Sequence, residues 1–514
     1  MIRAYPQDKD PAATQPRADA PGGAARPCGL PGADAGGASA TAHPPLVIDL
    51  DGTLLRSDLL LETGMAFVRN RPWQLFRPLL WLGRGRAALK EALARAARLD
   101  VSVLPYDPQV IALIRAERRS GRTVVLATAS HHSLAERIAE HLQLYDRVLA
   151  SSGDENLAAQ HKRDRLVELF GAQGFDYAGN SRADLPVWAA ARQAYVVNPA
   201  PGVERRARAQ GNVAQVLRTA PAAPRDWLHA LRLHQWTKNT LLFVPLLAAH
   251  QLGNGSLIWQ GLLAFLFFGL CASSVYLLND LLDLDDDRHH RTKCLRPFAA
   301  GRLSIRSGLL ALPGLLLLAF AGALGLLPWQ FSAVLLAYYA LTLAYSLVLK
   351  RYLAVDVIAL ALLYTSRIIA GAAVFDLPPT FWMLAFSMFM FLSLALVKRY
   401  AELHAALDRG LAAPSPGRGY CPADLGVISS LGAASGYLAV MVLALYIHDP
   451  LTAALYRQPH VIWLACPLLL FWITRVWMLT HRGQMHDDPV VFAIRDRASL
   501  AVGALFGLVF WIAT

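Results

Sequence analysis

Long apolar segments follow one another through the second half of the chain, and they constrain the fold more than any other feature. Most approach the length of about 20 residues that an α-helix needs to cross a bilayer. Hydrophobic residues make up 55% of the sequence and charged residues 17%, which excludes an ordinary soluble protein of this length. We therefore expect an all-α polytopic bundle of about nine transmembrane helices, at 239–252, 257–278, 309–327, 331–349, 353–374, 380–397, 427–447, 461–479 and 500–513.

The charge of the connecting loops predicts the orientation of this bundle. The loops after the second, fourth, sixth and eighth predicted helices contain six, two, four and three basic residues, whereas the opposite loops contain only Arg457. Basic loops usually remain in the cytoplasm. Although the net charge is +12, no basic stripe with interleaved aromatic residues is present, so we expect no nucleic-acid partner.

The chain before the apolar segments has the composition of a soluble domain. Residues 1–44 are rich in Pro, Gly and Ala and lack the apolar core of a signal peptide, which predicts a disordered tail. We expect a soluble domain at 45–218, a linker at 219–231 and the membrane domain at 232–514. The five cysteines are scattered and have no metal-binding spacing, which fits a reduced compartment.

Four short motifs mark the soluble domain. The segment "LVIDLDGTLL" is an apolar strand that runs into Asp49 and Asp51, and "TVVLATAS" is a second strand that reaches Thr128. Lys162 follows in a helical segment, and "YAGNSRAD" ends a third strand. Alternating strands and helices predict an α/β doubly wound parallel sheet with its site at the carboxyl ends of the strands. Together, in this order, the motifs resemble those of the haloacid dehalogenase (HAD) superfamily.

This resemblance implies a phosphatase in which Asp49 is the nucleophile and Asp51 the general acid and then base. It also implies that Thr128 and Lys162 hold the phosphoryl oxygens, and that Asn180 and Asp184 join the two aspartates around Mg²⁺. The family usually has an aspartate where this chain has Asn180, so a non-catalytic domain stays open. The segment 59–105 predicts a small helical cap, or else a surface whose Trp73, Phe76 and Trp81 contact the membrane.

An acidic segment, "NDLLDLDDD" at 279–287, follows the second apolar run. On a continuous helix, Asn279, Asp280, Asp283 and Asp287 fall within an arc of about 100°. Carboxylate and amide oxygens on one face suit Mg²⁺. His290, Lys293, Arg296 and Arg302 follow and could offset the charge of a polyanion. The bland alternative is an ordinary charged loop at the membrane surface.

The spacing of this segment resembles the first aspartate-rich motif of the UbiA-type intramembrane prenyltransferases. Further segments, among them "LRLHQWTKNTLLFVPLL" and "RTKCLRPFAAG", resemble the polyprenyl-phosphate phosphoribosyltransferases within that superfamily. Aromatic prenyltransferases have a second aspartate motif after the sixth helix, where this chain has "KRYAE", Lys398 to Glu402. Fixed cations replace a metal site there, which suits a substrate that carries additional phosphates.

The resemblance implies transfer of 5-phosphoribosyl from phosphoribosyl diphosphate to a polyprenyl phosphate. Asn279, Asp280, Asp283 and Asp287 would hold Mg²⁺ on the diphosphate. The charged pair Asp356 and Arg367, 11 residues apart within one apolar run, would lie on nearly the same helix face, with a functional or a structural role. Candidates for substrate contacts are Lys238, His290, Lys293, Arg296, Tyr345, Lys350, Asp356, Arg367, Lys398, Arg399 and Glu402.

Together, the two halves predict two steps on one chain. The HAD-like domain would remove the 5-phosphate from the first product and leave polyprenyl-phosphoryl-ribose, a precursor for cell-envelope glycans. We expect a multi-pass protein of the bacterial inner membrane with both sites in the cytoplasm, and a homo-oligomer stays open. Two alternatives are an aromatic prenyltransferase that uses a prenyl diphosphate, and a lipid carrier or transporter with a non-catalytic HAD module.

Overall fold

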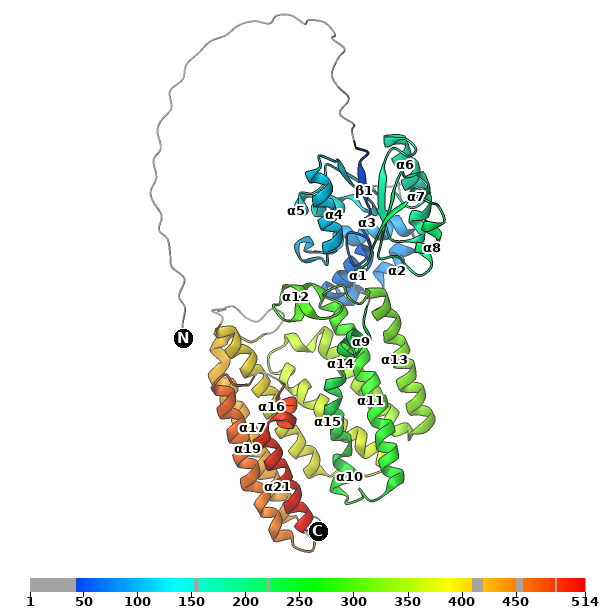
Figure 1. Ribbon diagram of the computed structural model, residues 1–514. Coiled ribbons are helices and arrows are strands. Elements are labelled where there is room, and N and C mark those ends of the chain that lie inside the picture. Colours follow the sequence, from blue (N-terminus) through cyan, green and yellow to red (C-terminus); the bar gives the residue numbers. More distant parts are fainter. Residues whose placement is uncertain are drawn as a thin grey trace, which may run out of the picture. The chain divides into compact units, whose positions relative to one another are not determined.

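A six-stranded, fully parallel sheet forms the centre of the N-terminal α/β part (Figure 1). The computed structural model describes residues 43–151, 157–219, 222–408, 419–449, 456–485 and 488–513, so most of the predicted tail at 1–44 lies outside the described residues. The strand order is β3-β2-β1-β4-β5-β6. The strands are β1 Leu46–Ile48, β2 Val124–His131, β3 Arg147–Ser151, β4 Asp176–Gly179, β5 Ala194–Val197 and β6 Val213–Leu217.

Helices cover both faces of this sheet. Successive side chains of a strand point to opposite faces, so each strand contributes to two cores. Leu46 and Ile48 of β1 share a core with Ile138, whereas Val47 shares another with Trp188. In Figure 1, α4 and α5 lie on one side of β1 and α6, α7 and α8 on the other. The prediction of a doubly wound parallel sheet is confirmed. These helices are α4 Pro108–Arg119, α5 His132–Leu142, α6 Gln160–Phe170, α7 Leu185–Ala190 and α8 Val203–Arg208.

A helical insert separates β1 from β2, as predicted for 59–105. It contains α1 Leu59–Asn70, α2 Arg77–Leu82 and α3 Arg86–Ala96, with short 3₁₀ turns at Pro72–Gln74 and Val101–Val103. Asp58 begins α1, because its carboxylate accepts hydrogen bonds from the free N–H groups of Leu60 and Leu61. The insert therefore starts directly beside the ends of the strands.

The C-terminal part is a bundle of apolar helices. Among the described residues, seven helices are long and apolar enough to cross a membrane, and a bent pair gives up to eight. They are α11 Gly255–Leu282, α13 Ile305–Leu326, α14 Trp329–Leu347, α15 Val355–Phe375, α16 Phe381–Leu407, α17 Leu425–His448 with its preceding turn, and α19 Ala465–His481 with its preceding turn. The pair is α20 Pro489–Arg495 and α21 Arg497–Ala513, bent by 80°.

Eight is one fewer than the nine or so that we expect, and the difference lies in the segment 239–252, which does not form one continuous helix in the described structure. That segment is divided between a 3₁₀ helix, Leu233–Phe243, and a five-residue helix, α10 Val244–Ala248. Its N-terminal side chains Lys238 and Asn239 are buried against polar partners inside the bundle.

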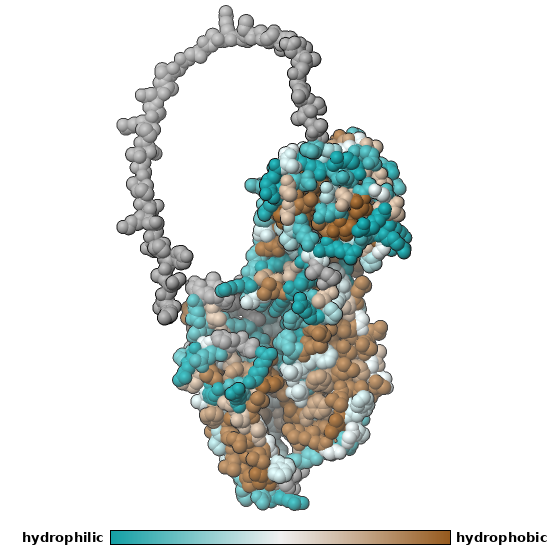
Figure 2. All heavy atoms as spheres, in the orientation of Figure 1, coloured by the Kyte–Doolittle hydropathy of each residue, from teal (hydrophilic) through white to brown (hydrophobic). Residues whose placement is uncertain are grey.

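The outer surface of the bundle is apolar. Figure 2 shows brown, hydrophobic residues gathered over the helical part. Only 11% of the apolar stretch of α13 is buried inside the bundle, and Leu310 and Leu317 expose most of their surface. Leucine side chains on such a face require hydrocarbon around them, so this surface is the lipid-facing side.

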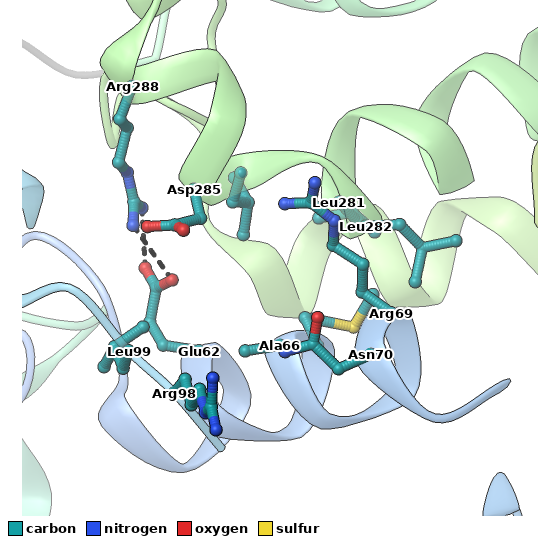
Figure 3. A pocket seen from close by; sticks show the side chains of 12 residues that line it. Glu62, Ala66, Arg69, Asn70, Arg98, Leu99, Leu281, Leu282, Asp285 and Arg288 are labelled. Carbon is teal, nitrogen blue, oxygen red and sulfur yellow. Dashed lines mark hydrogen bonds and ion pairs between the residues drawn. The ribbon is translucent and has the colours of Figure 1, made fainter. Parts of the chain in front are cut away.

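An ion pair with almost no solvent exposure joins the α/β insert to the helical bundle. Arg288 of α12 (Leu284–His289) donates through Nη1 and Nη2 to both carboxylate oxygens of Glu62 on α1, at 3.0 and 2.7 Å. Arg69, which lies seven residues further along α1, pairs with Asp286. Figure 3 shows Glu62 and Arg288 pointing toward one another, joined by dashed lines. Residues 43–514 form one compact unit.

Candidate active sites

The four predicted HAD motifs meet at the carboxyl edge of the sheet. Asp49 directly follows β1, Thr128 lies on β2, and Asn180 directly follows β4. Since β1 lies between β2 and β4, these three positions are neighbours. A cavity of about 360 Å³ opens here, and its wall includes Asp49, Asp51, Lys162, Asn180 and Asp184.

A buried lysine, Lys162, connects the carboxylates of Asp49 and Asp184 inside this cavity, the second through a tyrosine. Lys162 Nζ donates to Asp49 Oδ1 at 2.7 Å and to the Tyr177 hydroxyl at 3.0 Å. Tyr177 in turn donates to Asp184 Oδ1 at 2.8 Å. Burial raises the pKa of Asp49 to about 7, against the opposing effect of Lys162. Tyr177 is a connecting residue that the sequence motifs did not indicate, since it is only an inward-facing strand position.

Asp51 is held in place by hydrogen bonds from two directions. Ser130 Oγ donates to its Oδ2 at 2.6 Å, and the backbone N–H of Leu59 donates to its Oδ1 at 2.7 Å. Burial raises the pKa of Asp51 above its usual value, which suits a group that must give and take a proton. Thr128 Oγ1 accepts from the N–H of Ser130 at 3.0 Å. Thr128 therefore helps to fix the end of β2, which carries Ser130.

Gly52 allows the first and fourth motifs to approach each other. Its φ is +77°, a conformation that favours glycine. A Cβ at this position would lie 2.1 Å from Nδ2 of Asn180. The amide of Asn180 thus packs directly over the loop that joins Asp49 and Asp51.

The residues present at this edge fit Mg²⁺. Asp49, Asp51 and Asn180 offer hard oxygen donors to one cavity, which is the ligand chemistry that Mg²⁺ prefers. Asp184 accepts hydrogen bonds from Tyr177, Ser181 and the N–H groups of Asn180 and Ser181. It therefore fixes the loop of Asn180, and its predicted contact with Mg²⁺ stays a prediction.

The rim of the cavity is shared between the two parts of the chain. Arg56 and Asp58 line it from the α/β part, and Ser304, Ile305 and Arg306 line it from the start of α13. Arg306 Nη2 donates to Asp58 Oδ2 at 2.5 Å. A membrane helix therefore forms part of the entrance to the HAD site.

In the bundle, two of the predicted acidic ligands meet at one arginine. Arg296 Nη1 donates to Asp280 Oδ1 at 3.1 Å and to Asp287 Oδ2 at 2.7 Å. Arg232 pairs with Asp280 from the other side. Burial raises the pKa of Asp287 to about 6, with Arg296 opposing it. Arg296 Nη1 thus joins two oxygen donors of the kind that Mg²⁺ prefers.

The structure does not bring all four predicted ligands of this site together. Among the described residues, no group of three or more His, Cys, Asp or Glu side chains is arranged to hold a metal ion. α11 ends at Leu282 and α12 begins at Leu284, so the continuous helix assumed for 279–287 is interrupted at Asp283. The Asp283 carboxylate lies 3.8 Å from Lys350 Nζ and 4.0 Å from Arg69 Nε. Asn279 is partly buried beside this break.

Two predicted phosphate contacts, Lys238 and Lys398, converge on a residue that the sequence did not single out as part of a site. Their Nζ atoms lie 2.8 and 3.2 Å from Oδ2 of Asp488, which precedes α20. Tyr364 also donates to this carboxylate. Burial alone would raise the pKa of Asp488, but the two lysines hold it well below its usual range. The sequence signal was only the segment "RGQMHDDPVVFAIRDRAS" at 482–499, which resembles the phosphoribosyltransferases but gives Asp488 no role.

Arg367 lies deeper in the bundle and is structural in its contacts. It donates to Asn239 Oδ1 and to the Tyr338 hydroxyl, both at 3.2 Å, and to the backbone of Leu363. Its guanidinium also lies 5.1 to 5.7 Å from the centres of three aromatic rings, those of Phe268, Tyr338 and Tyr364. These neutral oxygens and aromatic rings stabilise the buried guanidinium without a carboxylate.

The remaining predicted residues divide into a buried cluster and an exposed group. Arg399 pairs with Asp356 and Glu402, and it donates to the Tyr345 hydroxyl at 3.0 Å. Asp356 is fully buried and accepts from Tyr345 at 2.9 Å, so it is part of this closed cluster rather than free to line a cavity. His290 and Lys293, by contrast, lie on the loop after α12, where Lys293 is exposed and His290 Nδ1 accepts from the N–H of Thr292.

Comparison with known families decides to which family the membrane part belongs. The profile of the UbiA prenyltransferase family matches residues 240–511. The chain belongs to the UbiA prenyltransferase family. The profile of the haloacid dehalogenase-like hydrolases matches residues 46–188. This UbiA protein is therefore a multi-pass membrane transferase with a phosphatase-like domain before it, and the lipid-carrier alternative loses its basis.

Relatives cover either the whole chain or its membrane part. Protein y4nM of Sinorhizobium fredii, which is uncharacterized, is 40% identical over 91% of each chain. The decaprenyl-phosphate phosphoribosyltransferase of Mycobacterium tuberculosis is 32% identical over 55% of this chain and 91% of its own. A UbiA homolog from Archaeoglobus fulgidus, solved with DMAPP and Mg²⁺, is 18% identical over 56% of this chain and 98% of its own, with a TM-score of 0.42.

Proposed function

We propose that the membrane part transfers 5-phosphoribosyl from phosphoribosyl diphosphate to a polyprenyl phosphate. The observation that carries this proposal is the group formed by Asp280, Asp287 and Arg296, in which metal-binding oxygens and a phosphate-binding cation touch each other. The relative that is named a decaprenyl-phosphate phosphoribosyltransferase supports both the donor and the acceptor. We place the reaction on the cytoplasmic side, to which the basic loops point.

In the proposed reaction, an oxygen of the lipid phosphate attacks the anomeric carbon of the ribose. The bond from that carbon to the diphosphate oxygen breaks, and pyrophosphate leaves with the electron pair. Asp280 and Asp287 would hold Mg²⁺, which, when bound, offsets the charge of the leaving diphosphate. Arg232 and Arg296 are fixed cations beside the same carboxylates and would bind phosphate oxygens without reorganising.

Lys238 and Lys398 are our candidates for the remaining phosphates of the substrates. Both reach one point in the bundle although 160 positions separate them in the sequence. Asp488 holds them there, so a phosphate entering the site would replace or join its carboxylate. The lipid phosphate carries negative charge near neutral pH, and this nucleophile needs no strong general base.

We further propose that the HAD-like domain removes the 5-phosphate from the first product. Asp49 would attack phosphorus, and Asp51 would donate its proton to the departing 5-hydroxyl oxygen. Asp51 would then take a proton from the water that hydrolyses the aspartyl-phosphate. Lys162 Nζ, next to Asp49, would bind a phosphoryl oxygen. The products are polyprenyl-phosphoryl-ribose and inorganic phosphate.

The shared rim of the HAD cavity supports this coupling. Ser304, Ile305 and Arg306 belong to the first turn of a lipid-facing helix, and they line the entrance to the cavity of Asp49. A substrate that is bound to a lipid would reach this entrance along α13, whereas a small soluble phosphate ester would need no such wall. Arg56 and Arg306 add positive charge where an anionic substrate would enter.

A choice of donor tests the proposal directly. The purified full-length protein in nanodiscs would receive Mg²⁺ and either labelled phosphoribosyl diphosphate with decaprenyl phosphate, or a prenyl diphosphate with an aromatic acceptor. We expect pyrophosphate release and a ribose-containing lipid only with the first pair. Release with the second pair alone would establish the aromatic prenyltransferase alternative instead.

A further inference from the structure

The cap insert exposes a continuous apolar segment that neither proposed reaction uses. Between the end of α1 and the start of α3, five side chains expose more than half of their surface to solvent. These are Trp73 at 78%, Leu75 at 61%, Phe76 at 59%, Leu79 at 70% and Leu80 at 64%. Scattered exposed leucines are normal on a protein surface, but five large apolar residues within eight positions form a binding surface.

The segment is fixed to the domain from its inner side, so its exposed residues are not simply an unfolded loop. Trp81 of α2 packs edge-on against Phe67 of α1, with ring centres 5.2 Å apart. Phe67 is completely buried, together with Leu93 of α3. Trp81 thus faces inward, contrary to its predicted membrane contact, and it turns the opposite side of α2 outward.

The position of the segment follows from the ion pairs that anchor α1. Arg69, in the last turn of α1, pairs with Asp286, and Glu62 pairs with Arg288, both just after α11. Figure 3 shows Arg69 and Asn70 beside Leu281 and Leu282. Leu282 is the last residue of the transmembrane helix α11. The apolar segment therefore begins beside the end of α11.

The charges of the segment match a lipid surface. Arg71, Arg77 and Arg84 are exposed and alternate with the apolar residues in the sequence, and no acidic residue occurs between Arg71 and Arg84. A short segment with Trp, Phe and Leu on one side and arginines at its edges is typical of helices that lie in the membrane interface. Arginine stems reach over apolar surface while their charge remains at the phosphates.

We propose that residues 71–84 insert their apolar side chains into the bilayer interface beside α13 and contact anionic phospholipid headgroups through Arg71, Arg77 and Arg84. The bilayer is the occupant that the observations favour, because the segment begins beside the end of a transmembrane helix and its charged residues are all arginines. This contact would hold the cap, and with it the entrance to the HAD cavity, against the membrane surface. The proposal does not depend on which substrates the two sites use.

Photo-crosslinking tests this contact in the intact protein. The photoreactive residue p-benzoylphenylalanine would replace Leu79 in full-length protein in nanodiscs of phosphatidylethanolamine and phosphatidylglycerol. Leu310 on α13 is the lipid-facing reference, and the exposed Glu168 on α6 is the control far from any span in sequence. We expect a yield of lipid adduct at position 79 within about threefold of that at position 310, and almost none at position 168.

Two outcomes would overturn the proposal. One is a lipid yield at position 79 as low as that at position 168, and the other is an adduct to a second copy of the chain in place of lipid. The contribution of charge has its own test, in which Arg77→Glu and Arg84→Glu are combined with the same probe. The yield should fall in nanodiscs that contain phosphatidylglycerol and remain unchanged in purely zwitterionic ones. An unchanged yield in both would refute the headgroup contact.

Discussion

In the α/β part Asp49 pairs with one buried cation, Lys162, whereas in the membrane part Asp280 pairs with two, Arg232 and Arg296, the second of which it shares with Asp287. The same difference recurs at Asp488, which is matched by two lysines. Where carboxylates outnumber fixed cations, a metal cation binds to the carboxylates first, and phosphate then binds to the metal. An excess of fixed cations binds polyanions directly.

The surroundings of the two regions explain this difference. A carboxylate inside an apolar bundle is costly unless a counter-charge is built in beside it, and Asp280, Asp356 and Asp488 all have one. The HAD cavity opens at the edge of a sheet, where water and Mg²⁺ can take that role. Inside this cavity Lys162 is the cation beside Asp49, and Arg56 and Arg306 lie at the rim.

The largest effect is expected from a substitution of Asp49, which should stop the reaction of the α/β part and leave that of the membrane part. Asp49→Asn should lower removal of the 5-phosphate by at least about 1,000-fold, because the amide cannot form the aspartyl-phosphate. Formation of the phosphorylated lipid should continue, so that this lipid accumulates in a thin-layer assay with labelled phosphoribosyl diphosphate. Asp164→Asn, on the exposed surface of the same domain, is the control. If the dephosphorylated lipid still forms at the normal rate, the two steps are not coupled as proposed.

Asp280→Asn tests the cation-rich site in the same assay. We expect phosphoribosyl transfer to fall by about 100-fold or more, because one of the two carboxylates that share Arg296 loses its charge. Asp285→Asn is the matched control. Asp285 belongs to the same acidic run but lines the small pocket beside Glu62 and Arg288 (Figure 3). Equal losses in both variants would mean that the acidic run acts only through its total charge.

Glu62→Ala tests the contact that joins the two regions. Removing this carboxylate leaves Arg288 buried without its partner, which should lower the free energy of unfolding by about 3 kcal/mol. Thermal unfolding of the detergent-solubilised protein would measure the change. The double variant Glu62→Met with Arg288→Met should regain much of the stability, and Glu168→Ala at the surface should have little effect. A double variant no more stable than Glu62→Ala would show that the pair has a role beyond its charge balance.

The smallest effect is expected at Arg306, the cation that the membrane part contributes to the HAD rim. Arg306→Ala should lower kcat/KM for the lipid product roughly fivefold, since an exposed ion pair contributes up to about 1 kcal/mol. Turnover of p-nitrophenyl phosphate should be unchanged, because a small ester does not need the outer rim. Arg119→Ala, on the surface of α4, is the control. An equal loss for both substrates would assign Arg306 to general stability of the cavity.

The residues that define each part could be read from the sequence where the signal is local. The strand before Asp49, the apolar lengths of α11 to α19 and the order of the HAD motifs each depend on residues close together in the chain. The break of the helix at Asp283 is local as well, but the spacing of the aspartates did not reveal it, because they fit a continuous helix equally well.

The sequence by itself determined that a phosphatase-like α/β domain precedes a helical membrane transferase, because periodicity and motifs are properties of short segments. Only the tertiary structure decided that Asp488 joins Lys238 from 250 positions away, that Arg232 completes the surroundings of Asp280, and that Arg306 lies at the mouth of the HAD cavity. A charge deep in a bundle must find its counter-charge in space. That partner can come from any helix that packs beside it, so no spacing along the chain predicts it.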